Sequence, residues 1–223
     1  MNAKHLLRTQ ASETSEVSNM KIIYENDDVL VIDKPAGVNA DDFEKRVHRL
    51  DKDTSGILLI AKNDKALDFL QKEFQERRVE KKYIALVVGV LKNDKGEIKT
   101  LLGRSQQDRR KQRAYLLHEP SSEGKREAIT EYQVLQKFQN YTLIGVNIKT
   151  GRKHQIRTHF NYLHHPIAGD KLYGFKNQPC PKGLMRQFLH ANYLKIKLPN
   201  NQIKEFESRL PEELEEILKN LKI

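Results

Sequence analysis

The sequence contains a single cysteine, Cys180, in 223 residues. One thiol excludes a disulfide framework within the chain and a zinc site that is built on several cysteines. Long apolar runs are also missing, because the longest, at 57–61, has the length of a strand and falls far short of the ~20 residues that span a membrane. The first twenty residues lack the apolar segment of a secretory signal. These absences predict a protein of the reducing cytoplasm with no membrane partner.

Motifs for the common bound groups are missing as well. The sequence has no phosphate-cradling P-loop, no glycine fingerprint for a dinucleotide and no Cys/His cluster with the spacing of metal ligands. Chemistry in this protein, if there is any, is therefore expected to use side chains alone.

Acidic residues are too few to balance the basic ones. Forty Lys and Arg stand against thirty Asp and Glu, so that the formal net charge is +10 and the pI is near 9.5. With 38% hydrophobic and 31% charged residues, the chain is neither a disordered polyampholyte nor a membrane protein. The charge favours a polyanionic partner such as RNA, DNA or anionic lipid. It does not choose among them, because many basic proteins bind no nucleic acid.

The distribution of apolar residues predicts an α+β fold. Residues 1–19 are polar and are expected to form a flexible tail, and a β-hairpin is expected at 20–32. Further strands are expected at 57–62, 83–90, 130–135, 141–149, 193–198 and 202–206, and helices after Asn63, at 152–163 and after Pro211. Because turns rather than crossover helices separate most strands, we expect one domain at 20–223, built on a largely antiparallel, mixed β-sheet with flanking helices and loops.

A dense polar segment at 47–56 precedes the strand expected at 57–62. In an extended backbone Arg49 and Asp51 project to the same side. A carboxylate beside a guanidinium stays ionised, and a positioned carboxylate can act as a nucleophile. The alternative is that residues 53–56 simply form a turn, in which Asp and Ser bond the local backbone.

A second segment, 150–160, combines Gln, His and Arg with little acid to balance them. A helix at 152–163 places His154, Arg157 and Asn161 on one face, and the basic residues at its start favour a phosphate. The two histidines of the segment do not converge as metal ligands. The alternative interpretation is a basic, solvated helix face.

Two further features concern single residues or a loop. Tyr83 opens an expected strand, where a tyrosine can stack on a base or transfer a proton, although its spacing alone favours a place in the core. Residues 104–113 hold five basic side chains and one acid, which predicts a mobile loop that binds phosphates.

Six motifs in order resemble those of the RluA-type pseudouridine synthases. The most specific is the His-Arg-Leu-Asp segment at 48–51 with its Thr-Ser-Gly turn at 54–56. The others match in the family's order and cover about residues 20–215: they lie at 31–37, 82–85, 150–157, 165–174 and 189–191. With all six motifs considered together, the alternative of a mere turn around Asp51 becomes the weaker one. The resemblance implies the pseudouridine synthase fold and a catalytic domain at 20–223.

The resemblance also implies an isomerase and its residues. Uridine in structured RNA would become pseudouridine by cleavage of the glycosidic bond, rotation of the base and formation of a C–C bond. Asp51 matches the nucleophile, Arg157 the basic residue that pairs with it, and Tyr83 the tyrosine against the base. Arg49 matches the residue that fills the gap left by the flipped nucleotide. No metal and no cofactor are implied. The expected RNA contacts are Arg49, His48, Thr54, Arg109, Arg110, Lys111, Arg113, Arg152 and His154.

Two departures from the family leave the RNA target open. Only ten residues separate Gly37 from His48, a shorter connection than the family usually has. No S4-like RNA-binding domain is expected ahead of Met20, so that recognition would rest on the catalytic domain. We expect ribosomal or transfer RNA stem-loops as the partner, with no obligate protein partner and a monomeric enzyme. The alternatives are a non-catalytic RNA-binding or ribosome-assembly factor that kept the fold, and a hydrolase that releases uracil.

Overall fold

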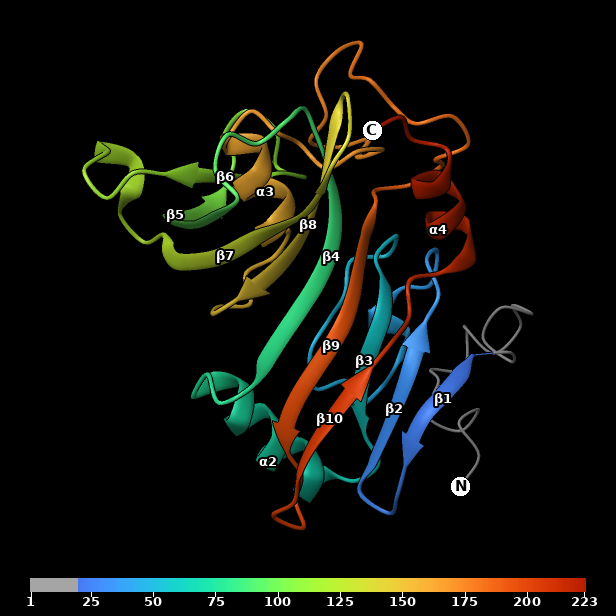
Figure 1. Ribbon diagram of the computed structural model, residues 1–223. Coiled ribbons are helices and arrows are strands. Elements are labelled where there is room, and N and C mark those ends of the chain that lie inside the picture. The colour runs from blue at the N-terminus through green and yellow to red at the C-terminus, as the bar shows by residue number, and fades with distance from the viewer. Residues whose placement is uncertain (1–19) are drawn as a thin grey trace. The chain divides into compact units, whose positions relative to one another are not determined.

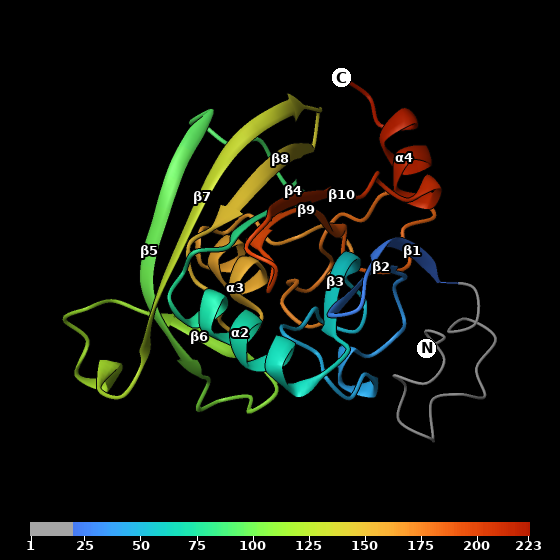
Figure 2. The same cartoon turned by 90° about the horizontal axis from the view of Figure 1, so that it is seen from below.

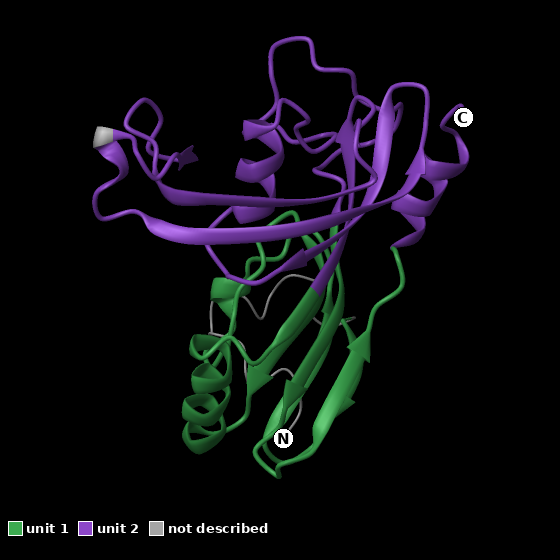
Figure 3. Cartoon of the chain, turned by 60° about the vertical axis from the view of Figure 1, so that its left-hand side comes forward, with its two compact units in different colours: residues 1–81, 190–210 green, residues 82–189, 211–223 purple. Residues whose placement is uncertain are grey.

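The computed structural model describes residues 20–223, so the tail expected at 1–19 lies outside the described residues. The described chain forms two compact units, which Figure 3 shows in two colours. Unit 1 holds residues 20–81 and His190–Leu210, and unit 2 holds Lys82–Leu189 and Pro211–Ile223. Both units combine strands with at least one helix, so the predicted α+β class is confirmed. In the part of the chain that is described, no helix is long and apolar enough to cross a membrane.

Unit 1 contains a mixed sheet (Figure 1). β1 (Lys21–Glu25) and β2 (Val29–Lys34) form the expected antiparallel hairpin, and β2 also pairs antiparallel with β3 (Ser55–Ala61). β3 runs parallel to the start of β9 (Leu189–Lys197), which forms the second expected hairpin with β10 (Ile203–Glu207). A largely antiparallel sheet with a parallel pair agrees with the prediction.

The helix of unit 1, α2 (Asp64–Gln75), begins where the sequence predicts. The side chain of Asn63 accepts a hydrogen bond from the Ala66 amide at 2.9 Å, which satisfies one of the free N–H groups at the helix start. Ala66 and Leu70 lie one turn apart and are both buried. Their burial attaches α2 to the sheet.

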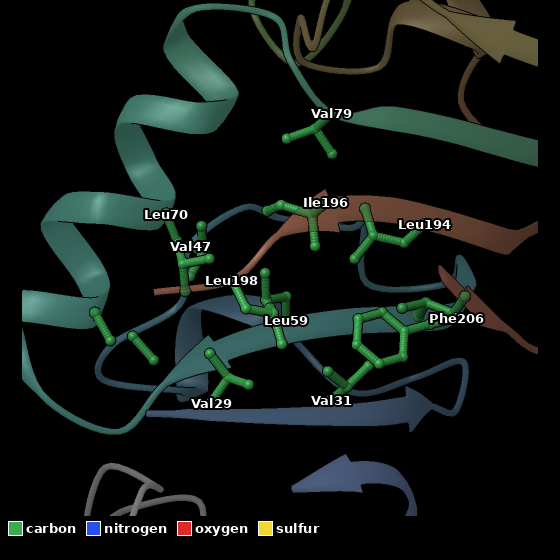
Figure 4. Packing of buried hydrophobic residues seen from close by; sticks show 13 residues of the cluster. Val29, Val31, Val47, Leu59, Leu70, Val79, Leu194, Ile196, Leu198 and Phe206 are labelled. Carbon is green, nitrogen blue, oxygen red and sulfur yellow. The ribbon is translucent and has the colours of Figure 1, made fainter. Parts of the chain in front are cut away.

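The apolar run of β3 is continuous because both faces of this strand are covered. On one face Ile57 and Leu59 belong to a cluster with Leu70 of α2 (Figure 4), which also contains Val29, Val31, Val47, Val79, Leu194, Ile196, Leu198 and Phe206. On the other face Leu58 and Ile60 pack with residues from 38–43, a connection that includes the short 3-10 helix η2 (Ala40–Asp42). A strand buried on both faces shows no alternation of polar and apolar side chains.

Unit 2 contains an antiparallel sheet in the order β4-β8-β7-β5-β6. β4 (Glu80–Val88), β7 (Arg126–Lys137) and β8 (Tyr141–Ile148) correspond to expected strands. β5 (Lys95–Arg104) and β6 (Gln112–Tyr115) were not expected. A signal for β5 was present, because Ile98, Thr100 and Leu102 alternate with more exposed residues and are buried.

Three helical segments complete unit 2, which Figure 2 shows from below. α3 (Gln155–Tyr162) starts three residues later than predicted, because His154 has a left-handed backbone with φ 55° and therefore stands outside the helix. α4 (Glu212–Lys219) follows Pro211 as predicted and buries Leu214 and Ile217. The 3-10 helix η3 (Pro120–Ser122) lies between β6 and β7.

Candidate active site

Asp51 stands at the start of a tight turn in unit 1. Its backbone carbonyl accepts a hydrogen bond from the Thr54 amide at 3.0 Å, and the next carbonyl, that of Lys52, accepts one from the Gly37 amide at 3.0 Å. A turn is therefore present, and it leaves the Asp51 residue partly exposed. The turn and the predicted role of its carboxylate do not exclude each other, because the turn uses backbone groups.

Lys34 joins the first motif to the Asp51 turn. The residue is completely buried, and its ammonium group donates to the carbonyls of Pro35, Val38 and Lys52 at 2.7, 2.9 and 3.1 Å. Three carbonyl acceptors match the three N–H donors of a lysine. The motif at 31–37 did not by itself predict this role of Lys34; a lysine that follows an apolar strand and precedes a proline was the available signal.

His48, an expected RNA contact, is engaged inside unit 1. Its Nε2 accepts a hydrogen bond from the Leu59 amide at 3.1 Å, and its ring stacks on Phe74 with the ring centroids 4.9 Å apart. Burial, with a smaller contribution from the charge of Lys81, lowers the pKa of His48 from 6.5 to about 3. The imidazole is therefore neutral, with its proton on Nδ1. Its contact with RNA stays a prediction, and the structure shows a role in holding segment 45–48 against β3.

The neighbouring expected RNA contacts differ in exposure. The Arg49 side chain is 49% exposed, with its Nη2 3.8 Å from Oδ2 of Asp41. Thr54 is only 2% exposed, which leaves little surface for RNA. Both contacts remain predictions.

A chain of polar side chains connects the last motif to this region of unit 1. Ser55 Oγ lies 2.9 Å from Nδ1 of His190, and Nε2 of His190 lies 3.2 Å from the Ser208 carbonyl. Ser208 Oγ donates in turn to Asp33 at 2.8 Å. Since a carbonyl only accepts, Nε2 of His190 carries the proton and Ser55 donates to Nδ1. These bonds tie the starts of β3 and β9 together.

In unit 2, Tyr83 lies in β4, where it pairs in register with Val146 of β8. It is 8% exposed. Such burial agrees with the core interpretation and is also compatible with a tyrosine that packs against a base. Its catalytic role stays a prediction.

Arg157 projects from α3 into the interior of unit 2. Its Nε and Nη2 donate to the two carboxylate oxygens of Asp170 at 2.7 and 2.9 Å. The alternative of a solvated basic face is wrong at this position, because Arg157 is 7% exposed. The pairing with Asp170 was missed, although Asp170 stands in one of the six motifs. The predicted pairing of Arg157 with Asp51 stays a prediction.

The predicted common helix face holds for Arg157 and Asn161 but not for His154, which precedes the helix, although all three residues meet Tyr173. Nδ1 of His154 lies 2.9 Å from the Tyr173 hydroxyl, and Nδ2 of Asn161 donates to the Tyr173 carbonyl at 2.6 Å. The guanidinium carbon of Arg157 lies 5.1 Å from the centre of the tyrosine ring, the distance of a cation–π contact. His154 takes part from the left-handed position ahead of the helix.

A buried polar network sets the position of α3 on the sheet of unit 2. The Gln155 side chain donates to the Ile129 carbonyl and to Thr130 Oγ1 at 3.0 and 2.9 Å. One turn further, His159 lies between Thr130 and Thr100, with its ring nitrogens 2.8 and 3.1 Å from their hydroxyl oxygens. Burial lowers the pKa of His159 to about 4, so the ring is neutral. The network fixes the rotation of the helix that carries Arg157.

The basic segment at 104–113 is a hairpin connection between β5 and β6. Its ends, Arg104 and Arg113, belong to the strands, and the Ser105 amide donates to the Lys111 carbonyl at 3.0 Å. Arg110 is 79% exposed and binds Asp108 through two nitrogens at 3.0 and 2.8 Å. The predicted loop is therefore shorter, at 105–111, and its one acid is paired.

Two more of the expected RNA contacts make bonds within unit 2. Arg113 binds Glu119 at 3.1 Å and lies over the ring of Tyr115. Nε of Arg152 donates to the Glu127 carbonyl of β7 at 2.9 Å. Arg109 and Lys111 are the remaining basic residues of the hairpin connection.

The predicted catalytic residues belong to different units. Asp51 lies in unit 1, and Tyr83 and Arg157 lie in unit 2. Within unit 1 the structure brings Asp51 together with His48, Arg49 and Thr54 in one loop. Within unit 2 it brings His154 and Arg157 together on Tyr173.

Comparison with known proteins assigns these units to a family. The sequence model of RNA pseudouridylate synthases matches residues 45–162, just over half of the chain. An uncharacterized RNA pseudouridine synthase of Bacillus subtilis (strain 168) is 35% identical over 236 residues, which cover 93% of this chain and 75% of the relative. Ribosomal large subunit pseudouridine synthase D of Borreliella burgdorferi is 34% identical, with 89% of this chain and 68% of the relative covered.

The structural comparison agrees. Human RNA pseudouridylate synthase domain containing 1 superposes with a TM-score of 0.77 at 29% identity, and the match covers 89% of this chain and 86% of the human one. The matched sequence segment includes the Asp51 loop, Tyr83 and α3, which carry the three predicted catalytic residues. The chain therefore belongs to the RNA pseudouridylate synthase family, the isomerases that convert uridine in RNA to pseudouridine.

Proposed function

We propose that this enzyme makes pseudouridine in ribosomal RNA, with Asp51 as the nucleophile and Tyr83 and Arg157 as further catalytic residues. The observation that carries the assignment is the family match at 45–162, because this segment contains all three residues. The geometry of each unit supports it. The turn of Asp51 is held by Lys34 in unit 1, and Arg157 is held by Asp170 in unit 2.

The proposed chemistry needs a carboxylate, a proton carrier and a charge of opposite sign. The Asp51 carboxylate attacks C1′ of the target nucleotide, as the carboxylate of a retaining glycosidase does, and the glycosidic bond to N1 of uracil breaks. The uracil is kept and turned, its C5 displaces Asp51 from C1′, and the proton on C5 is then removed while N1 gains one. Tyr83 packs against the base and serves proton transfer. A base stacked inside folded RNA must first be flipped out, and the exposed Arg49 is suited to fill the gap.

Ribosomal RNA is the proposed substrate because the Borreliella burgdorferi relative is a ribosomal large subunit pseudouridine synthase. Transfer RNA is the second candidate substrate. The exposed Arg109 and the half-buried Lys111 of the β5–β6 connection are proposed to bind phosphates beside the target, together with the other expected contacts. We further propose that the enzyme works in the cytoplasm as a monomer without an obligate protein partner. Native mass spectrometry of the purified protein tests the monomeric state.

Mapping of pseudouridine tests the proposal. Ribosomal and transfer RNA are collected from cells that lack the protein and from cells that express the wild type, Asp51→Asn or Asp53→Asn. Pseudouridines are then located by carbodiimide labelling and primer extension. We expect a wild-type-dependent stop in ribosomal RNA that Asp51→Asn abolishes while its dissociation constant for the RNA stays within about twofold. Asp53→Asn, a change of the same chemistry in the same turn, is expected to keep the stop.

The other outcomes are distinct. RNA binding without a stop in any RNA supports a non-catalytic binding or assembly factor, and a stop confined to transfer RNA replaces the proposed substrate. Free uracil in the supernatant identifies a hydrolase. A primer-extension stop of wild-type strength with Asp51→Asn contradicts the assignment of Asp51 as the nucleophile.

A further inference from the structure

Asp170 is the acidic residue of the motif at 165–174, and the proposed reaction gives it no part. Its side chain is fully buried, and Oδ2 accepts from Nε of Arg157 at 2.7 Å. Oδ1 accepts three N–H groups: Nη2 of Arg157 at 2.9 Å, the Leu172 amide at 2.9 Å and the Tyr173 amide at 3.0 Å. With four donors on two oxygens, the carboxylate plane is fixed by the backbone of its own turn.

The guanidinium plane of Arg157 is fixed in consequence. Two parallel N–H···O bonds between a guanidinium and a carboxylate hold both groups in one plane. Tyr173 adds a second constraint, because its ring lies 5.1 Å from the guanidinium carbon. The ring hydroxyl is bonded by His154 and the Gln112 amide, and the Tyr173 carbonyl accepts from Asn161. Burial acts to raise the pKa of Asp170, but the bond and charge of Arg157, together with the amides of Tyr173 and Leu172, outweigh it and lower the pKa. The carboxylate is therefore ionised at neutral pH.

Unit 1 contains a pair of the same type that serves as a comparison. Arg78 binds Glu73 through Nε and Nη2, and the Glu73 side chain is only 5% exposed. Glu73 lies on α2 and belongs to none of the six motifs. The two pairs share chemistry and burial of the carboxylate, but the Arg78 side chain is 46% exposed against 8% for Arg157, and Arg78 also binds Glu76.

We propose that Asp170 is a positioning residue for the reaction, which orients the guanidinium of Arg157 through the paired hydrogen bonds. This inference rests on the proposed catalytic role of Arg157. Asp170 itself does not meet the substrate in this proposal. Its loss is therefore expected to slow turnover without weakening the binding of RNA.

The test compares the steady-state kinetics of five variants on the RNA in which pseudouridine was mapped. Four are single variants, Asp170→Asn, Asp170→Ser, Arg157→Lys and Glu73→Gln. The fifth is the double variant that combines Arg157→Lys and Asp170→Asn. We expect Asp170→Asn to lower kcat by about 10- to 100-fold with KM within about twofold, because a misplaced group slows the chemical step. The serine variant keeps an acceptor for the backbone amides of the turn and loses the fork, so it is expected to lose kcat equally. Glu73→Gln is expected to lower the melting temperature and to leave kcat within about twofold.

The double variant shows whether Asp170 acts through Arg157 or independently of it. If Asp170 acts through Arg157, the double variant loses at most about threefold more kcat than the more impaired of the two single variants. If the two residues act independently, their separate losses of kcat multiply. A lowered kcat in Arg157→Lys together with a normal kcat in both Asp170 variants overturns the inference about Asp170 and leaves the proposed function standing. A fully active Arg157→Lys overturns the role of Arg157 in the proposed function. A fall in kcat with Glu73→Gln equal to that with Asp170→Asn, or loss of the fold in both Asp170 variants, assigns Asp170 a structural role and overturns the inference.

Discussion

Single residues in this protein show that burial, more than residue type, decides what an ionisable group does. His48 and His159 both belong to polar motifs that suggested contacts with RNA or a phosphate-binding helix face. Their rings are neutral and bonded inside unit 1 and unit 2, with the pKa lowered to about 3 and about 4, in both cases mainly by burial. Arg157 keeps its charge in the interior because Asp170 supplies an opposite charge and two acceptors.

The low pKa of His48 predicts a particular loss of stability in mild acid. Below about pH 6.5 the unfolded chain binds a proton that folded His48 takes up only near pH 3, so the free energy of unfolding decreases as the pH falls through this range. His48→Gln removes this contribution while its side-chain oxygen still accepts from the Leu59 amide. We expect urea denaturation between pH 6.5 and pH 5 to show a weaker pH dependence in this variant. The exposed His118→Gln is the control, and an unchanged slope in His48→Gln contradicts the role.

At the scale of elements, the join between β3 and β9 depends on one glycine. Gly56 has φ +114° and pairs with Ala191 in the parallel register, and a Cβ at this position would lie 2.2 Å from the Ala191 carbonyl oxygen. The Thr-Ser-Gly turn was recognised in the sequence as part of a motif. Its physical reason is that two backbones approach here more closely than any side chain permits.

Replacement of Gly56 separates steric contact from backbone strain. Gly56→Ala adds both, and we expect the free energy of unfolding to fall by more than the ~1–3 kcal/mol of a strained backbone alone. Gly124→Ala is the matched control, because Gly124 also has a positive φ of +70° but no atom lies within 4 Å of the added Cβ. Thermal melts measure both variants. Equal losses of stability in the two variants would show that the contact with Ala191 does not contribute to the free energy of unfolding.

At the scale of the whole molecule, the basic side chains include some that pair with an acid and some that are exposed. Many of the lysines and arginines bind a neighbouring acid, as Lys195 does with Glu205 and Arg110 with Asp108. Each pair holds one cation and one acid, so pairing leaves the net charge of +10 unchanged and reduces how many of the forty cations are placed to meet phosphates. Arg109 and Lys111, at the connection of β5 and β6, are the basic residues that we expect to contribute most.

Salt dependence measures that contribution. In the linear plot of log K against log salt concentration, each lost phosphate contact reduces the slope by about 0.7–0.9. Arg109→Gln with Lys111→Gln is expected to reduce the slope for the target RNA by about 1.5, with kcat at saturating RNA within about twofold of the wild type. Lys195→Gln, which removes a cation paired with Glu205, is the control and is expected to leave the slope unchanged. An unchanged slope in the double variant excludes the connection as a phosphate contact.

The sequence by itself determined the order of the motifs, the residues of the proposed chemistry and most of the elements. Hairpins such as β1–β2 and β9–β10, the Asn63 cap and the common helix face of Arg157 and Asn161 depend on neighbours a few positions away, so local periodicity reveals them. The strand β5 also left an alternating pattern at this range.

The tertiary structure alone decided which groups are partners across long separations. Asp170 for Arg157, the Lys52 carbonyl for Lys34 and the Leu59 amide for His48 lie outside the range of any local pattern. The same holds for the parallel pairing of β3 with β9, which joins residues more than 130 positions apart. Burial and hydrogen bonding arise only when the chain has folded, because they depend on what excludes water from a group and not on the group itself.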